Sequence, residues 1–205
     1  MFVFEEPGER VVVLMTAGSL SVSQTTIAKL QHAIDCGDPE APSIMRAETM
    51  LDLAELVGRT LNELSVEISR RMAQNVAASA SILLGGQRRG GAPRLFLIYP
   101  EGNFIEATED TPFLQIGEHK YGKPILDRVV TPATSLEEGR KAVLISMDST
   151  LRSNLSVGMP LDLVTIRAGE CRVASRERIE PGDPAFTALS EAWSRTLREG
   201  FANLP

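Results

Sequence analysis

Short apolar runs separated by turn residues predict several β-strands. Residues 11–15 read Val-Val-Val-Leu-Met after a Pro-Gly turn signal, a pattern typical of a buried strand. Two more runs, 95–99 and 104–107, flank Pro-Glu-Gly-Asn at 100–103 and give the strongest hairpin signal in the chain. Further strands are predicted over 77–86, 113–116, 157–166 and 170–176.

Apolar residues spaced three or four positions apart predict the helices. The longest stripe indicates a core-facing helix and comprises Leu51, Ala54, Val57, Leu61, Leu64, Ile68 and Met72. An earlier helix with Ile27, Leu30 and Ile34 on its apolar face is expected to be capped by Ser21 or Ser23. A helix over 121–130 has Pro124 in its first turn, where the missing N–H costs little.

Two further helices complete the pattern. Ser135 and Glu138 form a capping-box signature, and the helix they open is predicted to bury Leu136, Val143, Leu144, Met147 and Leu151. The end of the chain is amphipathic, with Phe186, Leu189, Trp193 and Leu197 in register. This order of elements predicts an α+β fold in which helices cover antiparallel sheet. A length of 205 residues is most simply one domain, 1–205.

Composition narrows the class of protein. The net charge of -6 disfavours a general nucleic-acid or anionic-membrane binder, because both need a basic surface. No apolar run reaches the roughly 18 residues of a membrane span, and the first residues lack the basic start of a signal peptide. Cys36 and Cys171 are read as reduced thiols of a cytoplasmic protein. His32 and His119 show no ligand spacing, so we expect neither a metal nor a cofactor.

Candidate chemistry concentrates in polar loops. Residues 153–156, Ser-Asn-Leu-Ser, are either a site loop that supplies hydroxyl and amide groups or a helix C-cap and turn in which Asn154 adopts the left-handed conformation. Glu118, His119 and Lys120 form a polar cluster that is more simply a solvated loop. The basic, glycine-rich stretch 87–93 lacks the order of a phosphate-binding loop and favours a hairpin turn.

Three segments carry a resemblance to a known family. They are Tyr-Pro-Glu-Gly-Asn-Phe-Ile-Glu-Ala-Thr at 99–108, Gly-Glu-His-Lys-Tyr-Gly-Lys-Pro-Ile-Leu-Asp at 117–127, and the block 153–163. Together they resemble proteasome-type peptidases, specifically the bacterial ancestral β-subunit branch of the N-terminal-nucleophile (threonine) hydrolases. The resemblance extends over the whole chain and implies a four-layer αββα sandwich.

The resemblance also implies which residues support catalysis. In the family, an N-terminal threonine hydroxyl attacks the peptide carbonyl while its own amine acts as base. Gly18 matches the glycine whose N–H binds the oxyanion, and Thr16 and Leu20 match positions near the substrate side-chain pocket. Asn154 and Ser156 match the loop that orients the threonine, with Asn154 where an acid is usual. Glu118 falls near a loop that carries a supporting serine in proteasome subunits.

The nucleophile itself has no match in the printed sequence. Residues 2–4 resemble the strand after the first hairpin of the family, so the threonine, aspartate and lysine of that hairpin are expected to be absent along with the first strands. Two hypotheses follow: a threonine endopeptidase subunit whose printed sequence starts late, or a non-catalytic assembly subunit. The implied partners are a peptide or unfolded protein substrate, identical subunits in a ring or arc, and an unfoldase.

Overall fold

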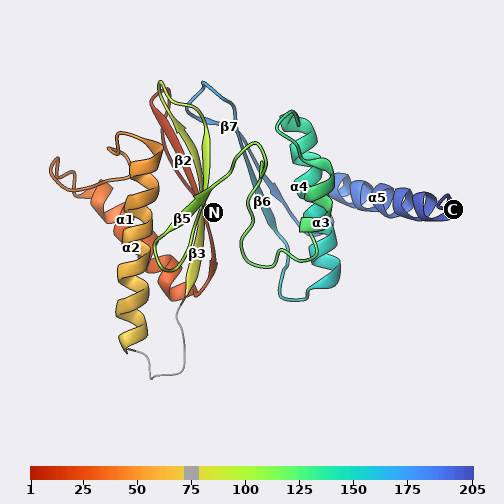
Figure 1. Cartoon of the computed structure of the whole chain (residues 1–205), viewed down its shortest axis with the longest axis horizontal. Helices are drawn as coiled ribbons and strands as arrows, with labels where there is room; N and C mark the ends of the chain where they lie inside the picture. Colours follow the sequence, from red (N-terminus) through yellow and green to blue (C-terminus); the bar gives the residue numbers. More distant parts are fainter. Residues whose placement is uncertain (72–78) are drawn as a thin grey trace. The chain divides into compact units, whose positions relative to one another are not determined.

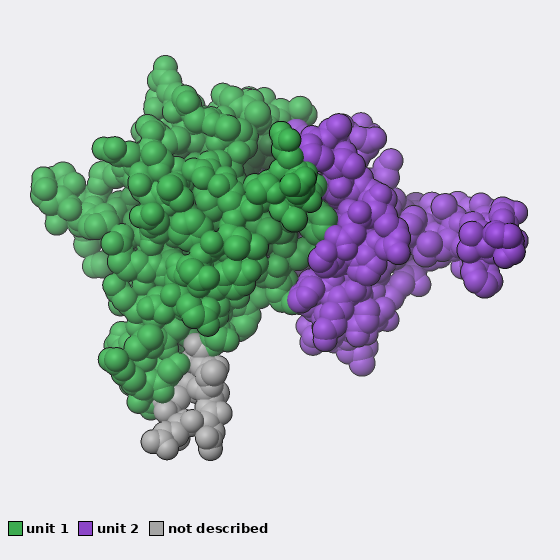
Figure 2. Space-filling model, in the orientation of Figure 1, with its two compact units in different colours: residues 1–117, 166–174 green, residues 118–165, 175–205 purple. Residues whose placement is uncertain are grey.

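The computed structural model describes residues 1–71 and 79–205 (Figure 1). The chain divides into two compact units, shown in separate colours in Figure 2. Residues 1–117 and 166–174 form the first unit, and residues 118–165 and 175–205 form the second. The combination of helices with antiparallel sheet confirms the predicted α+β class.

The first unit is built on a five-stranded antiparallel sheet in which strands adjacent in sequence are adjacent in space. Its strands are β1 (Phe2–Glu6), β2 (Arg10–Gly18), β3 (Ala80–Arg88), β4 (Arg94–Ile98) and β5 (Phe104–Glu106). Helices α1 (Leu20–Asp35) and α2 (Met50–Arg71) cover one face of this sheet (Figure 1). The core between them is a cluster of buried apolar side chains that includes Leu14, Leu53, Leu61, Leu84 and Phe96.

The predicted hairpins are confirmed, and α2 fixes the turn of one of them. Strands β4 and β5 pair through Leu97 and Ile105, on either side of the turn at 99–103. A Cβ at Gly58 of α2 would lie 2.2 Å from the carbonyl oxygen of Gly102, so the helix backbone rests directly on the turn. This close approach explains a glycine in the middle of a helix, where it otherwise costs about 1 kcal/mol.

Two predictions for the first unit are wrong. Neither Ser21 nor Ser23 caps α1, because the helix begins earlier: Ser19 is the N-cap and its side chain accepts from the Val22 N–H. Residues 113–116 form no strand, and the chain continues without regular structure to Gly117, which has a φ of 72°. Strand β3 also extends into the predicted turn, through Arg88. Met72 and residues 77–78 lie outside the described residues.

The second unit contains α3 (Lys123–Val129), α4 (Leu136–Ser153) and α5 (Pro184–Ala202). The capping box at the start of α4 is confirmed, since Ser135 and Glu138 bond reciprocally through side chain and backbone. Pro124 lies in the first turn of α3, as predicted. Leu144 is buried on α4 as expected, and Met147 and Leu151 pack against it, partly buried. Leu136 and Val143 are exposed, contrary to the prediction, and the buried residues of α4 include polar Ser146, Asp148 and Thr150.

Strands β6 (Leu161–Ile166) and β7 (Val173–Ile179) form a separate two-stranded sheet. Both start later than predicted. Strand β6 begins after Pro160, which has no N–H to donate to a neighbouring strand, and β7 begins after the turn at residues 167–172. In the first unit, buried Gln87 holds that turn: its Nε2 donates to the Gly91 carbonyl and its Oε1 accepts from the Gly169 N–H at 2.8 Å.

Candidate functional site

Asn154 is the centre of a polar network at the end of α4. Its side-chain Nδ2 donates to Glu118 Oε2 at 2.9 Å. Its Oδ1 accepts from both the backbone N–H of Ser156, at 2.9 Å, and the Ser156 hydroxyl, at 2.7 Å. These contacts fix the orientation of the amide, since a flipped side chain would set its NH2 group against the Ser156 N–H and its oxygen against the Glu118 carboxylate.

The structure agrees with one part of the capping interpretation of this loop and differs from another. Asn154 is the C-cap of α4, and its backbone N–H donates to the Thr150 carbonyl, as the capping interpretation predicts. However, its φ is -135°, so it adopts an extended conformation and not the left-handed one. Because the backbone N–H makes the capping bond, the side chain is available to bridge Glu118 and Ser156.

Glu118 supplies the carboxylate of this network. Its Oε1 accepts from the Lys120 backbone N–H at 3.1 Å. That bond, followed by the Asn154 amide and the charges of Lys120 and His119, holds the pKa of the Glu118 carboxyl below its ordinary value. The side chain is therefore ionised at neutral pH. An acid is thus present next to Asn154, contributed by a different loop.

The Ser156 hydroxyl acts as a donor to Asn154, which leaves its oxygen free to accept. A serine hydroxyl has one hydrogen, and Ser156 directs it at Asn154 Oδ1, which can only accept. The hydroxyl oxygen is therefore left with lone pairs, and Ser156 is exposed. A group that approaches it is best bound if it donates a hydrogen bond, as an amine does.

Gly18 ends β2 and leads directly into α1. Its φ is 97°, in the left-handed region, and a Cβ there would lie 2.5 Å from the Ser79 carbonyl oxygen. The next residue, Ser19, donates its backbone N–H to that same oxygen at 2.7 Å. The sharp strand-to-helix turn thus requires glycine on conformational grounds, whatever its N–H binds.

The other predicted residues lie around this turn. Thr16 is half-buried in β2 opposite Ile82 of β3, and Leu20 is exposed as the first residue of α1. Thr16, Gly18 and Leu20 thus occupy one strand–turn–helix segment of the first unit, and Asn154 and Ser156 occupy one loop of the second. Their functional assignments remain predictions.

Sequence reasoning missed the bond between Glu118 and Asn154. The two residues are 36 positions apart, in loops of no regular pattern, and no periodicity relates such positions. The sequence pointed to Glu118 and Asn154 separately, as members of two different polar loops. The only available signal was that both segments belong to the family-like blocks.

No metal or membrane feature emerges from the part of the chain that the structure describes. Within 1–71 and 79–205, no group of three or more acidic, histidine or cysteine side chains could hold a metal ion. Cys36 and Cys171 are both free thiols. Among the described helices, none combines the length and apolar character that a membrane span requires.

Solved structures provide the comparison with known proteins. The ancestral β-subunit (Anbu) from Yersinia bercovieri is 44% identical, with a TM-score of 0.91 over 100% of this chain and 84% of that chain. Anbu from Hyphomicrobium sp. strain MC1 is 45% identical, with a TM-score of 0.90 over the same shares.

A third similar structure is a helical assembly of the Anbu complex from Pseudomonas aeruginosa. It is 44% identical, with a TM-score of 0.92 over 100% of this chain and 83% of that chain. No protein-family model matches the sequence, and no curated protein matches it.

Proposed function

Because the chain belongs to the ancestral β-subunit (Anbu) family of proteasome-like proteins, we propose that it is a subunit of a threonine-type endopeptidase. Its 205 residues contribute the supporting part of the site, and the threonine nucleophile lies outside them. The observation that carries the proposal is the Glu118–Asn154–Ser156 network.

The direction of the hydrogen bonds in this network suits an N-terminal nucleophile. The free amine of such a residue is a hydrogen-bond donor, and Ser156 offers an acceptor whose own proton is committed to Asn154. The ionised Glu118 holds the Asn154 amide in the orientation that fixes Ser156. Asn154 and Ser156 are therefore positioning residues in this proposal.

Gly18 is the proposed oxyanion donor, with Thr16 and Leu20 beside the substrate side chain. A tetrahedral intermediate needs a donor that is fixed before the reaction. The turn at Gly18 is fixed by the bond from the Ser19 N–H to the Ser79 carbonyl. Peptides or unfolded segments are the matching substrates, and an unfoldase is a candidate partner.

The competing function is a non-catalytic assembly subunit. It is favoured by the helical assembly of the P. aeruginosa relative, which shows that such proteins associate with themselves. This function needs no nucleophile and predicts a stable oligomer that reacts with no threonine-directed electrophile.

Labelling separates the two functions. The protein is expressed with the in-frame sequence encoded upstream of the Met1 codon. After the processing that exposes a threonine amine, this extended protein is treated with a peptide epoxyketone. Our proposal predicts a covalent adduct by intact mass, and none on the printed 205 residues. An upstream sequence without a threonine-headed hairpin, or an extended protein without an adduct, supports the assembly subunit.

A further inference from the structure

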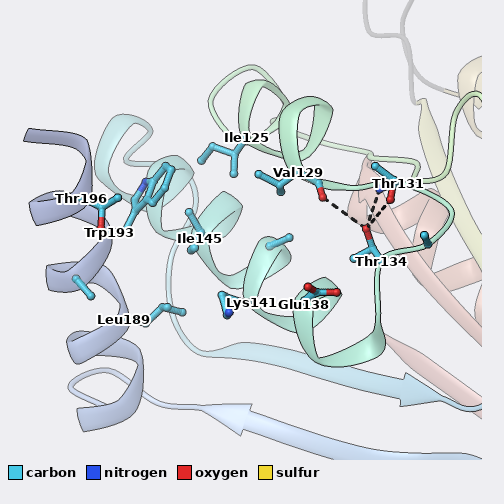
Figure 3. Close-up of a pocket in the computed structure, with 13 residues that line it drawn as sticks. Ile125, Val129, Thr131, Thr134, Glu138, Lys141, Ile145, Leu189, Trp193 and Thr196 are labelled. Carbon is cyan, nitrogen blue, oxygen red and sulfur yellow. Dashed lines mark hydrogen bonds between the residues drawn. The ribbon is translucent and has the colours of Figure 1, made fainter. Parts of the chain in front are cut away.

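A groove in the second unit lies between α3, the loop after it, α4 and α5. It has a volume of about 590 Å³, within the range of about 300–1,000 Å³ that is typical of pockets for small ligands. Figure 3 shows Ile125 and Val129 of α3, Ile145 of α4, and Leu189 and Trp193 of α5 around it. These walls are apolar, so the groove suits a ligand with an apolar body.

The α4 wall of this groove also carries two charges. Glu138, Lys141 and Ile145 are three and four residues apart, so they share one face of the helix. The two charged side chains are exposed, which places them at the rim. The Glu138 carboxylate is already bound, because its Oε2 accepts from both the backbone N–H and the hydroxyl of Ser135 in the capping box. Lys141 is therefore the charged group that is left to meet a ligand.

Two hydrogen-bond donors of the groove are unused within the described chain. Among residues 1–71 and 79–205, no ion pair or side-chain hydrogen bond involves the Lys141 ammonium or the Trp193 indole N–H. Both groups can donate but cannot accept. A ligand that meets them must therefore present an acceptor, and beside an ammonium the strongest acceptor is an anion.

We propose that the groove binds an aliphatic monocarboxylate. The apolar chain lies between Ile125, Ile145 and Trp193, and the carboxylate lies beside Lys141. Each methylene that leaves water on binding strengthens the affinity about fourfold. The carboxylate stays at the exposed rim, so its charge keeps part of its hydration while it accepts charge-assisted hydrogen bonds from the ammonium.

An aliphatic chain fits these walls better than a peptide segment. A peptide brings backbone N–H groups, and each of them needs an acceptor. The Thr134 hydroxyl already accepts from the Thr131 backbone N–H at 2.8 Å, and it lies 3.3 Å from the Thr131 hydroxyl and 3.5 Å from the Val129 carbonyl (Figure 3). The two threonines thus bond to each other, whereas an aliphatic chain requires no polar partner.

This binding site is separate from the proposed peptidase chemistry. Among the described residues that line the groove, none belongs to the Glu118–Asn154–Ser156 network. Binding of a carboxylate here needs no nucleophile, so it goes beyond the proposed function and can be measured on the printed 205 residues. Epoxyketone labelling of the extended protein reports on the peptidase alone, and failure of one proposal leaves the other standing.

Tryptophan fluorescence tests the site directly, because Trp193 is the only tryptophan of the chain. Sodium octanoate should shift the Trp193 emission to shorter wavelength in a saturable way, since the chain displaces water from the indole. Hexanoate, which is two methylenes shorter, should bind about 15-fold more weakly. Octylamine has the same chain with a cationic head and should bind more weakly than octanoate. No saturable shift with octanoate, or octylamine binding that is at least as tight, would overturn the proposal.

Substitutions locate the head group and the chain. Lys141→Gln should weaken octanoate binding about two- to fivefold, as expected for an exposed ion pair, and should leave the binding of octan-1-ol unchanged. Lys29→Gln removes the same charge from an exposed position on α1 and is the matched control. Ala192→Phe fills the groove and should abolish the emission shift. Octanoate binding that is unchanged by Lys141→Gln or by Ala192→Phe, or that is weakened equally by Lys29→Gln, would contradict the proposal.

Discussion

The side-chain amide of Asn154 donates to the carboxylate of Glu118 at 2.9 Å, joining two loops that are 36 positions apart. This bond places a carboxylate beside Asn154, the position at which the family resemblance implies an acid. It also orients Asn154 so that both of its Oδ1 contacts go to Ser156.

Asn154→Asp should release the loop. The substitution removes the Nδ2 donor and places a second carboxylate next to Glu118, and like charges at this distance repel. We expect faster amide hydrogen exchange at Ser156 and slower epoxyketone labelling of the extended protein. The control is Asn103→Asp in the turn after β4, which should leave both rates unchanged. Unchanged exchange at Ser156 in Asn154→Asp would contradict the network.

The same network should weaken in acid. The pKa of Glu118 is lowered from 4.5 in the folded state, so its contribution is complete above pH 4.5 and is lost as the pH falls through the lower folded value. Hydrogen exchange at Ser156, corrected for its intrinsic pH dependence, should rise in that window. Glu118→Gln should remove this pH dependence, and a persistent pH dependence in that variant would assign it to another group.

Gly18→Ala should destabilise the first unit by about 1–3 kcal/mol, because a Cβ would clash with the Ser79 carbonyl at a left-handed φ. Urea unfolding measures the loss. Gly139→Ala in α4 is the matched control, since its Cβ meets nothing within 4 Å and alanine favours the helix, giving a gain of about 0.5–1 kcal/mol. Equal effects at both positions would rule out the steric explanation.

Gln87→Leu should cost about 0.5–1.5 kcal/mol, because it removes the hydrogen bonds of the buried Gln87 amide to the Gly91 carbonyl and the Gly169 N–H, two exposed groups that water can then bind. Urea unfolding measures this loss, and the Gly169 amide should exchange faster. Gln31→Leu, on the exposed side of α1, removes a side-chain bond to Asp35 and should have little effect. A neutral Gln87→Leu would show that the turn at 167–172 is held by other contacts.

Local signals predicted the regular elements well. The capping box of Ser135 and Glu138 and the hairpin around 100–103 are complete in a few residues, so the sequence contains all the information they need. The N-cap of α1 was predicted at the wrong serine because Ser19, Ser21 and Ser23 give the same capping signal in the local sequence. Only the turn at Gly18 selects Ser19. The strand expected at 113–116 had apolar residues but no partner strand among the described residues.

The site was less predictable than the fold. Asn154 and Ser156 were found together because they share one loop, and their Asx-type bonding is local. The contact of Asn154 with Glu118, and the burial of Asp148 and Ser190 beside Arg152, depend on tertiary packing. No spacing rule relates Asn154 to Glu118 or Arg152 to Ser190, whereas Asp148 and Arg152 stand four residues apart on α4.

Peptide mapping of the epoxyketone adduct on the extended protein tests the central claim most directly. Our account predicts a single adduct on a threonine at the processed N-terminus, formed more slowly in Ser156→Ala because the amine loses its acceptor. An adduct on Ser156 or Cys36, or no adduct on a folded, processed protein, would contradict it.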